Sequence, residues 1–392
     1  MNQRCPVFKA FFSGSYYGSE KQDCLSGGTE NPAFVLPQRQ PAGLKALKKY
    51  GKIKGEKLSH KGKHFMNISE IAKLAGVSNA AVSRYLNHGY LSEAKREVIE
   101  KVIRETGYRP SIQAQILRTR KTKTIGVILP KTDSFAVGNI MVGIDSVLER
   151  KGFQILLADS HNSPEKELEY LDTFDDQRVD GIIFIATVFT PEHLAELKKS
   201  KRPIVIVGQR LTGMSCVYHD DYHAFYDMTN LILQKGCRKL GYIGALAQDR
   251  AVGQQRSRAY CDAVQKAGLP DQAGHRVIAD FTVSSGYEKA KELLQAYGPL
   301  DAFICATDTM AAGALQYLKS QDIRVPQQIM VSGHGNSDIS AVTTPTITTI
   351  HYFYEESGSN AASILLEHIA QPDMPVKEIK LGYTIVENES TR

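Results

Sequence analysis

The chain has 392 residues, of which 42% are hydrophobic and 23% charged, and a formal net charge of +6 at pH 7. This length and composition allow two or three globular domains with buried cores. The sequence contains no apolar run long enough to span a bilayer and no secretory signal, so we expect a cytoplasmic protein without a membrane partner. The six cysteines form no CxxC pair, which predicts reduced thiols, no metal site and no disulfide framework.

Residues 1–65 differ in composition from the rest of the chain. They are rich in Gly, Ser, Pro and Lys and show no sustained helical or strand period. Such a composition is typical of disorder. A second interpretation is a leader that is not native protein, with translation starting at Met66. We therefore expect residues 1–65 to be either disordered or a non-native leader.

Residues 66–110, which we call the headpiece, have the pattern of three short helices. Asn67 and Glu70 have the spacing of a capping box at the start of the first helix. Ser78 can cap a second helix, and a third is predicted within 92–107. Two short helices joined by a tight, glycine-containing turn predict a helix-turn-helix.

The second helix begins with small and polar side chains, in the stretch GVSNAAVSRYLN. A helix that enters the DNA major groove must bring its N-terminal residues close to base edges, and small residues permit that approach. Asn79 can hydrogen-bond to a base edge, and the methyl groups of Ala80 and Ala81 can contact a thymine methyl. Arg84 can reach a guanine or a phosphate. The alternative is that this is an exposed helix of a helical domain that does not bind DNA. The predicted DNA-binding residues of the headpiece are Ser78, Asn79, Ala80, Ala81, Ser83, Arg84 and Asn87.

This segment resembles the headpiece of LacI/GalR-family transcriptional regulators. The likeness rests on NISEIAKLAGVSNAAVSRYLN, which is close to the family pattern T-I-x-D-V-A-x-x-A-G-V-S-x-x-T-V-S-R-x-L-N, and it continues more loosely to the C-terminus. Asn67 replaces the usual capping Thr, and Ala81 stands where Thr is common. The resemblance implies a homodimer that binds a near-palindromic double-stranded DNA operator and a small-molecule effector, without a cofactor.

Residues 111–123 follow as a basic linker. In the family this segment is a hinge that becomes helical on DNA and inserts a leucine into the minor groove. By that resemblance Leu117 is the inserted residue, and Ala114 and Arg118 also contact the DNA. An apolar wedge kinks the duplex while neighbouring basic residues attract phosphate. The alternative is a plain basic linker.

From Thr124 onward, short apolar strands such as TIGVILP, VDGIIFIA and AFICAT alternate with helical patterns. Repeated βα units predict parallel sheets with helices on both faces, and hence the α/β class. The resemblance implies a periplasmic-binding-protein-like core of two doubly wound subdomains, used for effector binding and dimerisation. We expect an N-subdomain of about 124–222 and 347–375, and a C-subdomain of about 223–346 and 376–392.

Ligands of open α/β sheets lie at the carboxyl ends of the strands, where this sequence places several polar residues. A sugar needs carboxylates and amides for its hydroxyls and an aromatic face for its C–H side. By resemblance, Arg256 and Asp308 match effector-contacting residues and Phe281 a common aromatic platform. A helix cap or a surface ion pair is the alternative for each residue taken alone. The predicted effector-binding residues are Lys131, Asp133, Ser134, Gln209, Arg256, Phe281, Asp308 and Tyr354.

Motifs of enzymes such as HExxH, GxSxG and Walker A are absent from the sequence, which predicts no enzyme. The predicted function is repression of a carbohydrate-utilisation operon, controlled by a sugar or sugar phosphate. An activator of the same family and a sugar-binding protein without a regulatory role are the alternatives. The stretches NHGYLSE, VYHDD and CATDTMAAGALQYL resemble those of sucrose- and trehalose-operon repressors. Lys131 is predicted to contact a phosphate group of the effector, the alternative being a solvated loop lysine.

Overall fold

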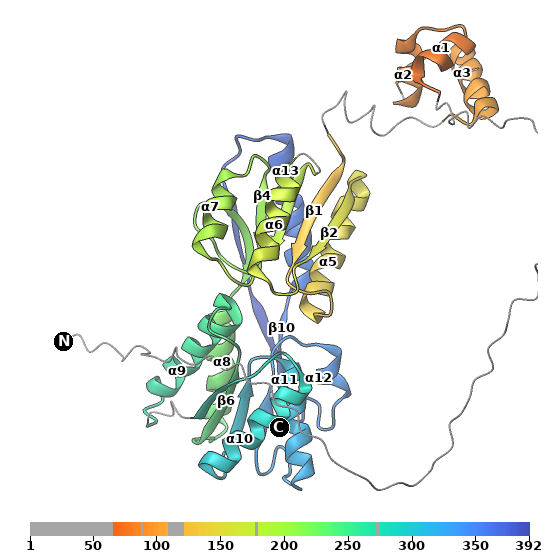
Figure 1. Cartoon of the computed structure of the whole chain (residues 1–392). Helices are drawn as coiled ribbons and strands as arrows, with labels where there is room; N and C mark the ends of the chain where they lie inside the picture. The colour runs from red at the N-terminus through yellow and green to blue at the C-terminus, as the bar shows by residue number, and fades with distance from the viewer. Residues whose placement is uncertain (1–65, 88, 109–120, 177–178, 271–274) are drawn as a thin grey trace, which may run out of the picture. The chain divides into compact units, whose positions relative to one another are not determined.

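The structure is a computed structural model that describes residues 66–87, 89–108, 121–176, 179–270 and 275–392 (Figure 1). The predicted leader, residues 1–65, lies outside the described residues. So do the predicted hinge contacts Ala114, Leu117 and Arg118. The headpiece and the remaining residues, which we call the core, are described separately.

The described part of the headpiece consists of three helices, as the sequence predicts. Asn67 and Glu70 form the predicted capping box: the Asn67 side chain accepts the Glu70 N–H at 3.1 Å, and the Glu70 carboxylate accepts the Asn67 N–H at 2.7 Å. Ser78 caps the second helix, since its Oγ accepts the Ala81 N–H at 3.3 Å. The helices are α1 (Ile68–Leu74), α2 (Asn79–Leu86) and α3 (Glu93–Thr106).

The core contains a first parallel sheet, with strand order β11-β5-β4-β3-β1-β2. Residues alternate between its two faces, as a strand requires: Ile183 and Ile185 pack with α5 and α13, whereas Ile182 and Phe184 pack with α6 and α7. Both faces are therefore covered, which explains the continuous apolar strands. The strands are β1 (Thr124–Leu129), β2 (Gln154–Asp159), β3 (Gly181–Ile185), β4 (Ile204–Val207), β5 (Ser215–His219) and β11 (Glu378–Leu381). The helices of this subdomain are α5 (Phe135–Leu148), η1 (Glu149–Lys151), α6 (Pro164–Asp175), α7 (Pro191–Lys199) and α13 (Tyr354–Ala370).

A second parallel sheet, with strand order β7-β6-β8-β9, forms the second subdomain. Helices α10 and α11 pack on one of its faces, and α8 and α9 on the other. Its strands are β6 (Leu240–Gly244), β7 (Arg276–Ile278), β8 (Ala302–Cys305) and β9 (Met330–Ser332). Its helices are α8 (Asp221–Gln234), the π-helix η2 (Arg250–Gln255), α9 (Arg256–Lys266), α10 (Val283–Tyr297), α11 (Asp308–Ser320) and α12 (Asp338–Val342).

The chain returns from the second sheet to the first near its C-terminus. Strands β10 (Thr349–Tyr352) and β12 (Tyr383–Val386) form an antiparallel ribbon, and β11 between them pairs in parallel with β5. The prediction that 376–392 belongs wholly to the C-subdomain is therefore wrong for β11. Its register on β5 is fixed by pairing between distant segments, which the local sequence does not encode.

Helices α5 and α13 approach each other closely at two glycines. A Cβ added to Gly143 would lie 2.0 Å from the carbonyl oxygen of Glu355, and one added to Gly358 would lie 2.0 Å from that of Ile140. Only glycine permits this spacing. The close approach brings together the N-terminal ends of the two helices, where the Phe135 and Tyr354 rings meet edge to face with centroids 6.4 Å apart.

Candidate functional site

The headpiece residues predicted to contact DNA reach the surface, with one exception. Ala81 is only 6% exposed and belongs to the headpiece core with Ile71, Val82 and Ile99. The prediction that its methyl group faces a base is therefore wrong. At about 100° per residue, Ala81 lies about 200° around the helix from Asn79, on the side that packs against the other helices.

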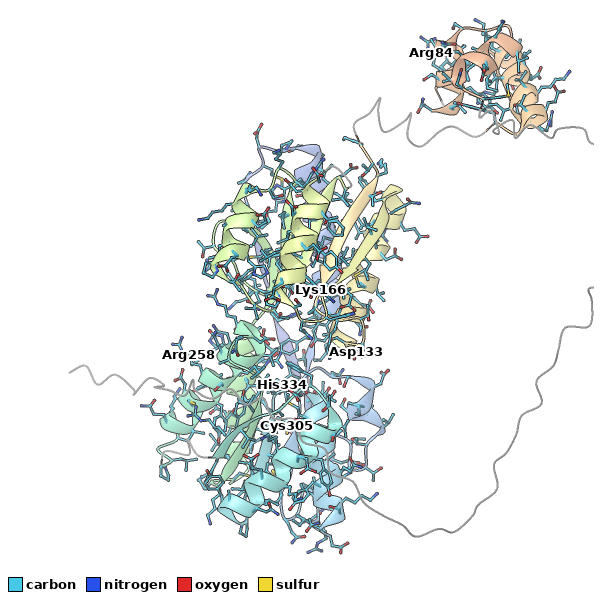
Figure 2. The ribbon with its side chains drawn as sticks, in the orientation of Figure 1. Arg84, Asp133, Lys166, Arg258, Cys305 and His334 are labelled. Atoms are coloured by element: carbon cyan, nitrogen blue, oxygen red, sulfur yellow. The ribbon has the colours of Figure 1, made fainter. Side chains whose placement is uncertain are left out.

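The remaining predicted residues lie at the headpiece surface. Asn79 is exposed, and its side-chain amide donates to the Ser69 Oγ at 3.0 Å, which fixes the orientation of the amide across the turn. Arg84 is exposed and makes no side-chain hydrogen bond or ion pair with the described residues (Figure 2). Asn87 donates to the Ser83 carbonyl at 2.6 Å. Ser78, Asn79, Ala80, Arg84 and Asn87 are exposed, and Ser83 is half-buried.

A cavity of about 250 Å³, which we call the cleft cavity, lies at the carboxyl ends of β4 and β5 and against η2. Its walls therefore come from the end of the first sheet and from a helix of the second subdomain. This is where open α/β sheets bind ligands. Its lining residues are Gly208, Gln209, Arg210, Tyr218, His219, Asp220, Asp221, Tyr222, Arg250, Ala251, Gln255 and Lys380.

Two buried polar atoms at this end of the core, the Oε1 of Gln209 and the Nε2 of His219, have no hydrogen-bond partner among the described residues. The buried hydroxyl of Tyr352 lies beside them and interacts with the Asp221 carboxylate. The amide nitrogen of Gln209 donates to the Thr187 carbonyl, so the side chain is fixed with its oxygen unused. The His219 and Tyr352 rings lie 5.0 Å apart between centroids. Because an unsatisfied buried polar group is costly, these atoms indicate a ligand or water site.

Arg256 is buried beside the cleft cavity and is held by internal partners. Its Nε and Nη2 donate to Asp221 Oδ1 at 2.9 and 2.6 Å, and its Nη1 donates to the Ala306 carbonyl at 2.5 Å. These bonds use three of the five N–H donors of the guanidinium, so two remain for a ligand. The charge of Arg256 is balanced by Asp221, as a buried cation requires.

Asp308 is buried and engaged inside the second subdomain. Its carboxylate accepts hydrogen bonds from the Ser337 N–H at 2.7 Å, the Ser337 hydroxyl at 2.9 Å and the Thr349 hydroxyl at 2.5 Å. Burial raises the pKa of Asp308, against these hydrogen bonds, which lower it. The carboxylate thus ties the start of α11 to two segments distant in sequence.

The structure brings together three other predicted residues. The Lys131 Nζ lies 3.4 Å from the Asp133 Oδ1 and 5.7 Å from the centroid of the Phe281 ring. Asp133 is largely exposed, and Figure 2 labels it at the end of the first subdomain. Ser134 caps α5, because its Oγ accepts the Val137 N–H at 3.4 Å. Lys131 and Phe281 come from different subdomains, so this contact spans the cleft.

Tyr354 begins α13 and joins the aromatic residues near the cleft cavity. Its ring centroid lies 5.3 Å from that of His219 and 5.9 Å from that of Tyr352. Arg256 lies over the Tyr352 ring at 5.4 Å. Tyr354 therefore joins Gln209 and Arg256 in one group, while Lys131, Asp133 and Phe281 form another.

Comparison with known proteins identifies the family. Residues 67–111 match the family described as "Bacterial regulatory proteins, lacI family", and residues 229–391 match the "Periplasmic binding protein-like domain". The chain is 35% identical over 308 residues to the sucrose operon repressor of Staphylococcus xylosus, covering 77% of this chain and 93% of that protein. The chain belongs to the LacI family.

Other LacI-family proteins align over similar lengths. The transcriptional regulator RegA of Clostridium saccharobutylicum is 30% identical over 328 residues, covering 83% of this chain and 99% of that protein. A structure of the transcriptional regulator CelR in complex with cellobiose matches with a TM-score of 0.64 at 25% identity, covering 83% of this chain and 99% of that one. The lac repressor dimer bound to operator and the anti-inducer ONPF matches with a TM-score of 0.76 at 20% identity and the same coverage, which supports the fold. The predicted headpiece and two-subdomain α/β core are confirmed.

Sequence reasoning missed several residues of the cleft in this LacI-family chain. His219 ends β5, within the VYHDD stretch, and Tyr352 ends β10, so inspection of every strand end would have found both. Arg250 lies in a π-helix, a feature that often marks functional sites but has no sequence pattern of its own. Among the described residues, no helix is long and apolar enough to cross a membrane, and no group of three or more His, Cys, Asp or Glu could hold a metal.

Proposed function

We propose that the chain is a homodimeric transcriptional repressor of a carbohydrate-utilisation operon, whose operator affinity is controlled by a sugar or sugar phosphate in the cleft cavity. The observation that carries the ligand part is the pair of unsatisfied buried atoms on Gln209 and His219, beside the buried Tyr352 hydroxyl. The likeness to the sucrose operon repressor and to the CelR–cellobiose complex supports the same ligand class.

The chemistry of these atoms suits hydroxyl groups. The Gln209 Oε1 is an acceptor, and burial lowers the pKa of His219, so its imidazole is neutral; in the tautomer with its proton on Nδ1, the unpartnered Nε2 is a second acceptor. The Tyr352 hydroxyl both donates and accepts. A sugar supplies hydroxyl donors to the two acceptors and C–H groups to the aromatic rings of Tyr352 and Tyr354. The two remaining N–H donors of Arg256 bind a further sugar oxygen.

Lys131 supplies the contact that distinguishes a phosphorylated sugar from a free one. Its ammonium lies between Asp133 and the Phe281 ring, at a contact between the subdomains. A phosphate group competes with the single, largely exposed Asp133 carboxylate for this ammonium, and an exposed ion pair costs little to replace.

In the headpiece, Asn79 and Ala80 read bases, and Arg84 reaches a guanine or a phosphate. Ser78, Ser83 and Asn87 lie beside these residues and contact the DNA backbone. The hinge residues Ala114 and Leu117 bind the minor groove, and Arg118 binds a phosphate.

An apolar surface on the first subdomain accommodates the second copy. Val142 on α5 is 54% exposed, and Leu157 on the edge strand β2, on the same face as Ile155, is 44% exposed. We expect Leu157→Asp to shift the chain from dimer to monomer in sedimentation velocity. The control Leu194→Asp, on α7 of the same subdomain, leaves the dimer intact.

The test of the whole proposal is operator binding with and without sugar. An operator is selected from random duplex DNA with the full chain, and its affinity is then measured with sucrose, cellobiose, sucrose 6-phosphate or no ligand. We expect at least one sugar to change the affinity, and Gln209→Ala to weaken that response roughly tenfold through the loss of a buried hydrogen bond. The control Gln371→Ala, at the exposed end of α13, leaves the response unchanged. If no DNA sequence is selected, the proposal that the chain is a DNA-binding regulator is wrong. If an operator is selected but no sugar changes its affinity, the proposal that a sugar is the effector is wrong.

A further inference from the structure

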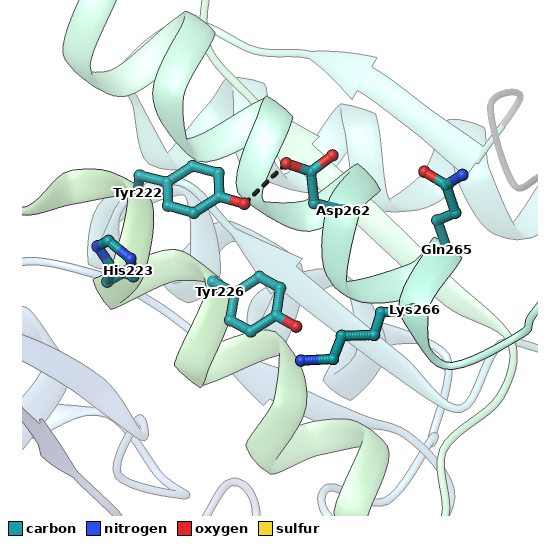
Figure 3. A pocket seen from close by; sticks show the side chains of 6 residues that line it. All are labelled: Tyr222, His223, Tyr226, Asp262, Gln265 and Lys266. Carbon is teal, nitrogen blue, oxygen red and sulfur yellow. Dashed lines mark hydrogen bonds between the residues drawn. The ribbon is translucent and has the colours of Figure 1, made fainter. Parts of the chain in front are cut away.

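A second cavity, of about 570 Å³, lies outside the cleft cavity, between α8 and α9 (Figure 3). Three of its lining residues come from the first turns of α8 and three from the last turns of α9. On each helix two of them are four residues apart and so share one face. The cavity is shallow and open to solvent on one side, so a ligand there would be only partly enclosed. We call it the α8–α9 cavity; it is lined by Tyr222, His223, Tyr226, Asp262, Gln265 and Lys266.

One wall of the α8–α9 cavity is aromatic. The rings of Tyr222 and Tyr226 are stacked, with centroids 6.1 Å apart and an angle of 17° between their planes. Both rings pack against buried apolar residues of the second subdomain. The Tyr222 hydroxyl donates to Asp262 at 2.7 Å, which fixes that ring across the cavity (Figure 3). The Tyr226 hydroxyl makes no hydrogen bond with the described residues.

The opposite wall holds donors that lack internal partners. The Asp262 carboxylate is already engaged by Tyr222 and lies 3.5 Å from the Arg258 Nε. Lys266 forms no ion pair with the described residues, and its ammonium lies 5.7 Å from the Tyr226 ring centroid. The Gln265 amide likewise has no hydrogen bond within the described part of the chain. The cavity therefore offers an aromatic surface, an ammonium and an amide, which match a ligand with apolar C–H groups and an anionic, oxygen-rich end.

We propose that the α8–α9 cavity binds a second small ligand, a monosaccharide that carries a phosphate group. The sugar ring packs on Tyr226 and hydrogen-bonds to Gln265, and the phosphate accepts from Lys266. Arg258 offsets part of the charge of the Asp262 carboxylate, which weakens the repulsion between Asp262 and the phosphate. This site is separate from the cleft cavity of the proposed function.

The first turn of α8 connects the two cavities. Tyr222 lines both of them. Its neighbour Asp221 holds Arg256, and His223 on its other side lies 2.8 Å from Asp220, a residue of the cleft wall. The sugar packs on Tyr226, whose ring is stacked on that of Tyr222, so the ligand acts on the cleft wall through this ring pair. Occupation of this cavity changes the affinity for the operator through the same helix turn.

A single tryptophan can report on the α8–α9 cavity, because the chain contains none. The Tyr226→Trp protein, as the full chain, is titrated with glucose 6-phosphate and with glucose while its fluorescence is recorded. We expect a saturable change, with glucose binding roughly tenfold more weakly because it lacks the charge-assisted hydrogen bonds. The control reporter Tyr297→Trp, at the exposed end of α10, shows no change.

Two further variants locate the ligand. Added to the reporter, Lys266→Ala is expected to weaken glucose 6-phosphate binding roughly tenfold, whereas Lys198→Ala, at the matching last turn of α7, has no effect. Gln209→Ala in the cleft leaves the response unchanged. The site is refuted if no saturable change occurs, if glucose and its phosphate bind equally, or if the response depends on Gln209 and not on Lys266. In that last case the ligand lies in the cleft and the proposed function stands.

The connection between the cavities is tested by operator affinity in the presence of glucose 6-phosphate. We expect the affinity to change in the wild type and Lys266→Ala to abolish the change. An unchanged operator affinity, with the α8–α9 cavity saturated, contradicts transmission through Tyr222.

Discussion

The exposed face of α2 and the cleft of the core differ in whether their charged side chains already have partners within the protein. Arg84 on α2 is exposed and without a side-chain partner among the described residues, so its interactions are left for a partner molecule. Arg256 in the cleft is buried and already holds Asp221 and the Ala306 carbonyl. A change on the exposed face of α2 is therefore expected to alter binding without altering folding. A change in the cleft is expected to alter both, because the ligand site and the internal network share atoms.

The largest expected effect is in the cleft, where Arg256→Ala leaves the Asp221 carboxylate buried without its cation. Removing one partner of a buried ion pair typically costs about 3–5 kcal/mol of unfolding free energy. Urea denaturation of the full chain measures the loss. The control Arg258→Ala, two residues away, breaks an exposed pair with Asp262 and is expected to cost far less. Equal losses for the two variants would show that burial does not set the cost of removing an arginine from its ion pair.

On the exposed face of α2, Asn79→Ala is expected to change which operator is preferred, with about 1–3 kcal/mol lost on the best site and little on others. The hinge variant Arg118→Ala, by contrast, removes a phosphate contact and weakens binding to every site. Competition between selected operators, measured by fluorescence anisotropy, separates the two patterns. A uniform loss for Asn79→Ala would exclude it from base readout.

Acid is expected to destabilise the core through its buried histidines. Burial lowers the pKa of His219 and, well below 6.5, that of His334, which lies inside the second subdomain near Cys305 (Figure 2). Below about pH 6.5 the unfolded chain therefore binds more protons than the folded one, so stability falls as the pH falls toward the folded pKa. Each such group contributes up to about 1.4 kcal/mol per pH unit in that window.

His334→Phe removes one of these groups, so the unfolding free energy of the variant is expected to depend less steeply on pH. Urea midpoints between pH 7 and pH 5 provide the measurement. An unchanged slope would mean that His334 does not resist protonation in the folded state.

The smallest expected effects are those of replacing the adjacent residues Ala80 and Ala81, which lie on different sides of α2. Ala80 is exposed, so Ala80→Ser is expected to alter operator preference without loss of stability. Ala81→Ser places a hydroxyl in the headpiece core, which costs roughly 1 kcal/mol, and leaves operator preference unchanged. Hydrogen exchange of the α2 amides, together with operator competition, tests both. If Ala81→Ser changed operator preference and Ala80→Ser lowered stability, Ala81 would contact the DNA after all.

Local features of this protein could be predicted from the sequence, whereas contacts between distant segments could not. The capping box of Asn67 and Glu70 was predictable because its groups are three residues apart. Ala81 was misplaced because the small size of a residue does not say which side of a helix it occupies. Asp308 follows a strand as expected, but its partners Ser337 and Thr349 come from remote segments, so its internal bonds had no local signature. Strand β11 was assigned to the wrong subdomain for the same reason.

The central claim, that a sugar in the cleft controls operator binding, is tested most directly through reciprocity. If the sugar changes operator affinity by some factor, saturating operator must change sugar affinity by the same factor. Calorimetric titration of the full chain with the active sugar, with and without saturating operator, measures that factor. We predict that it equals the one found in operator titrations and that Gln209→Ala weakens sugar binding in both states. An identical sugar affinity with and without operator would contradict the account.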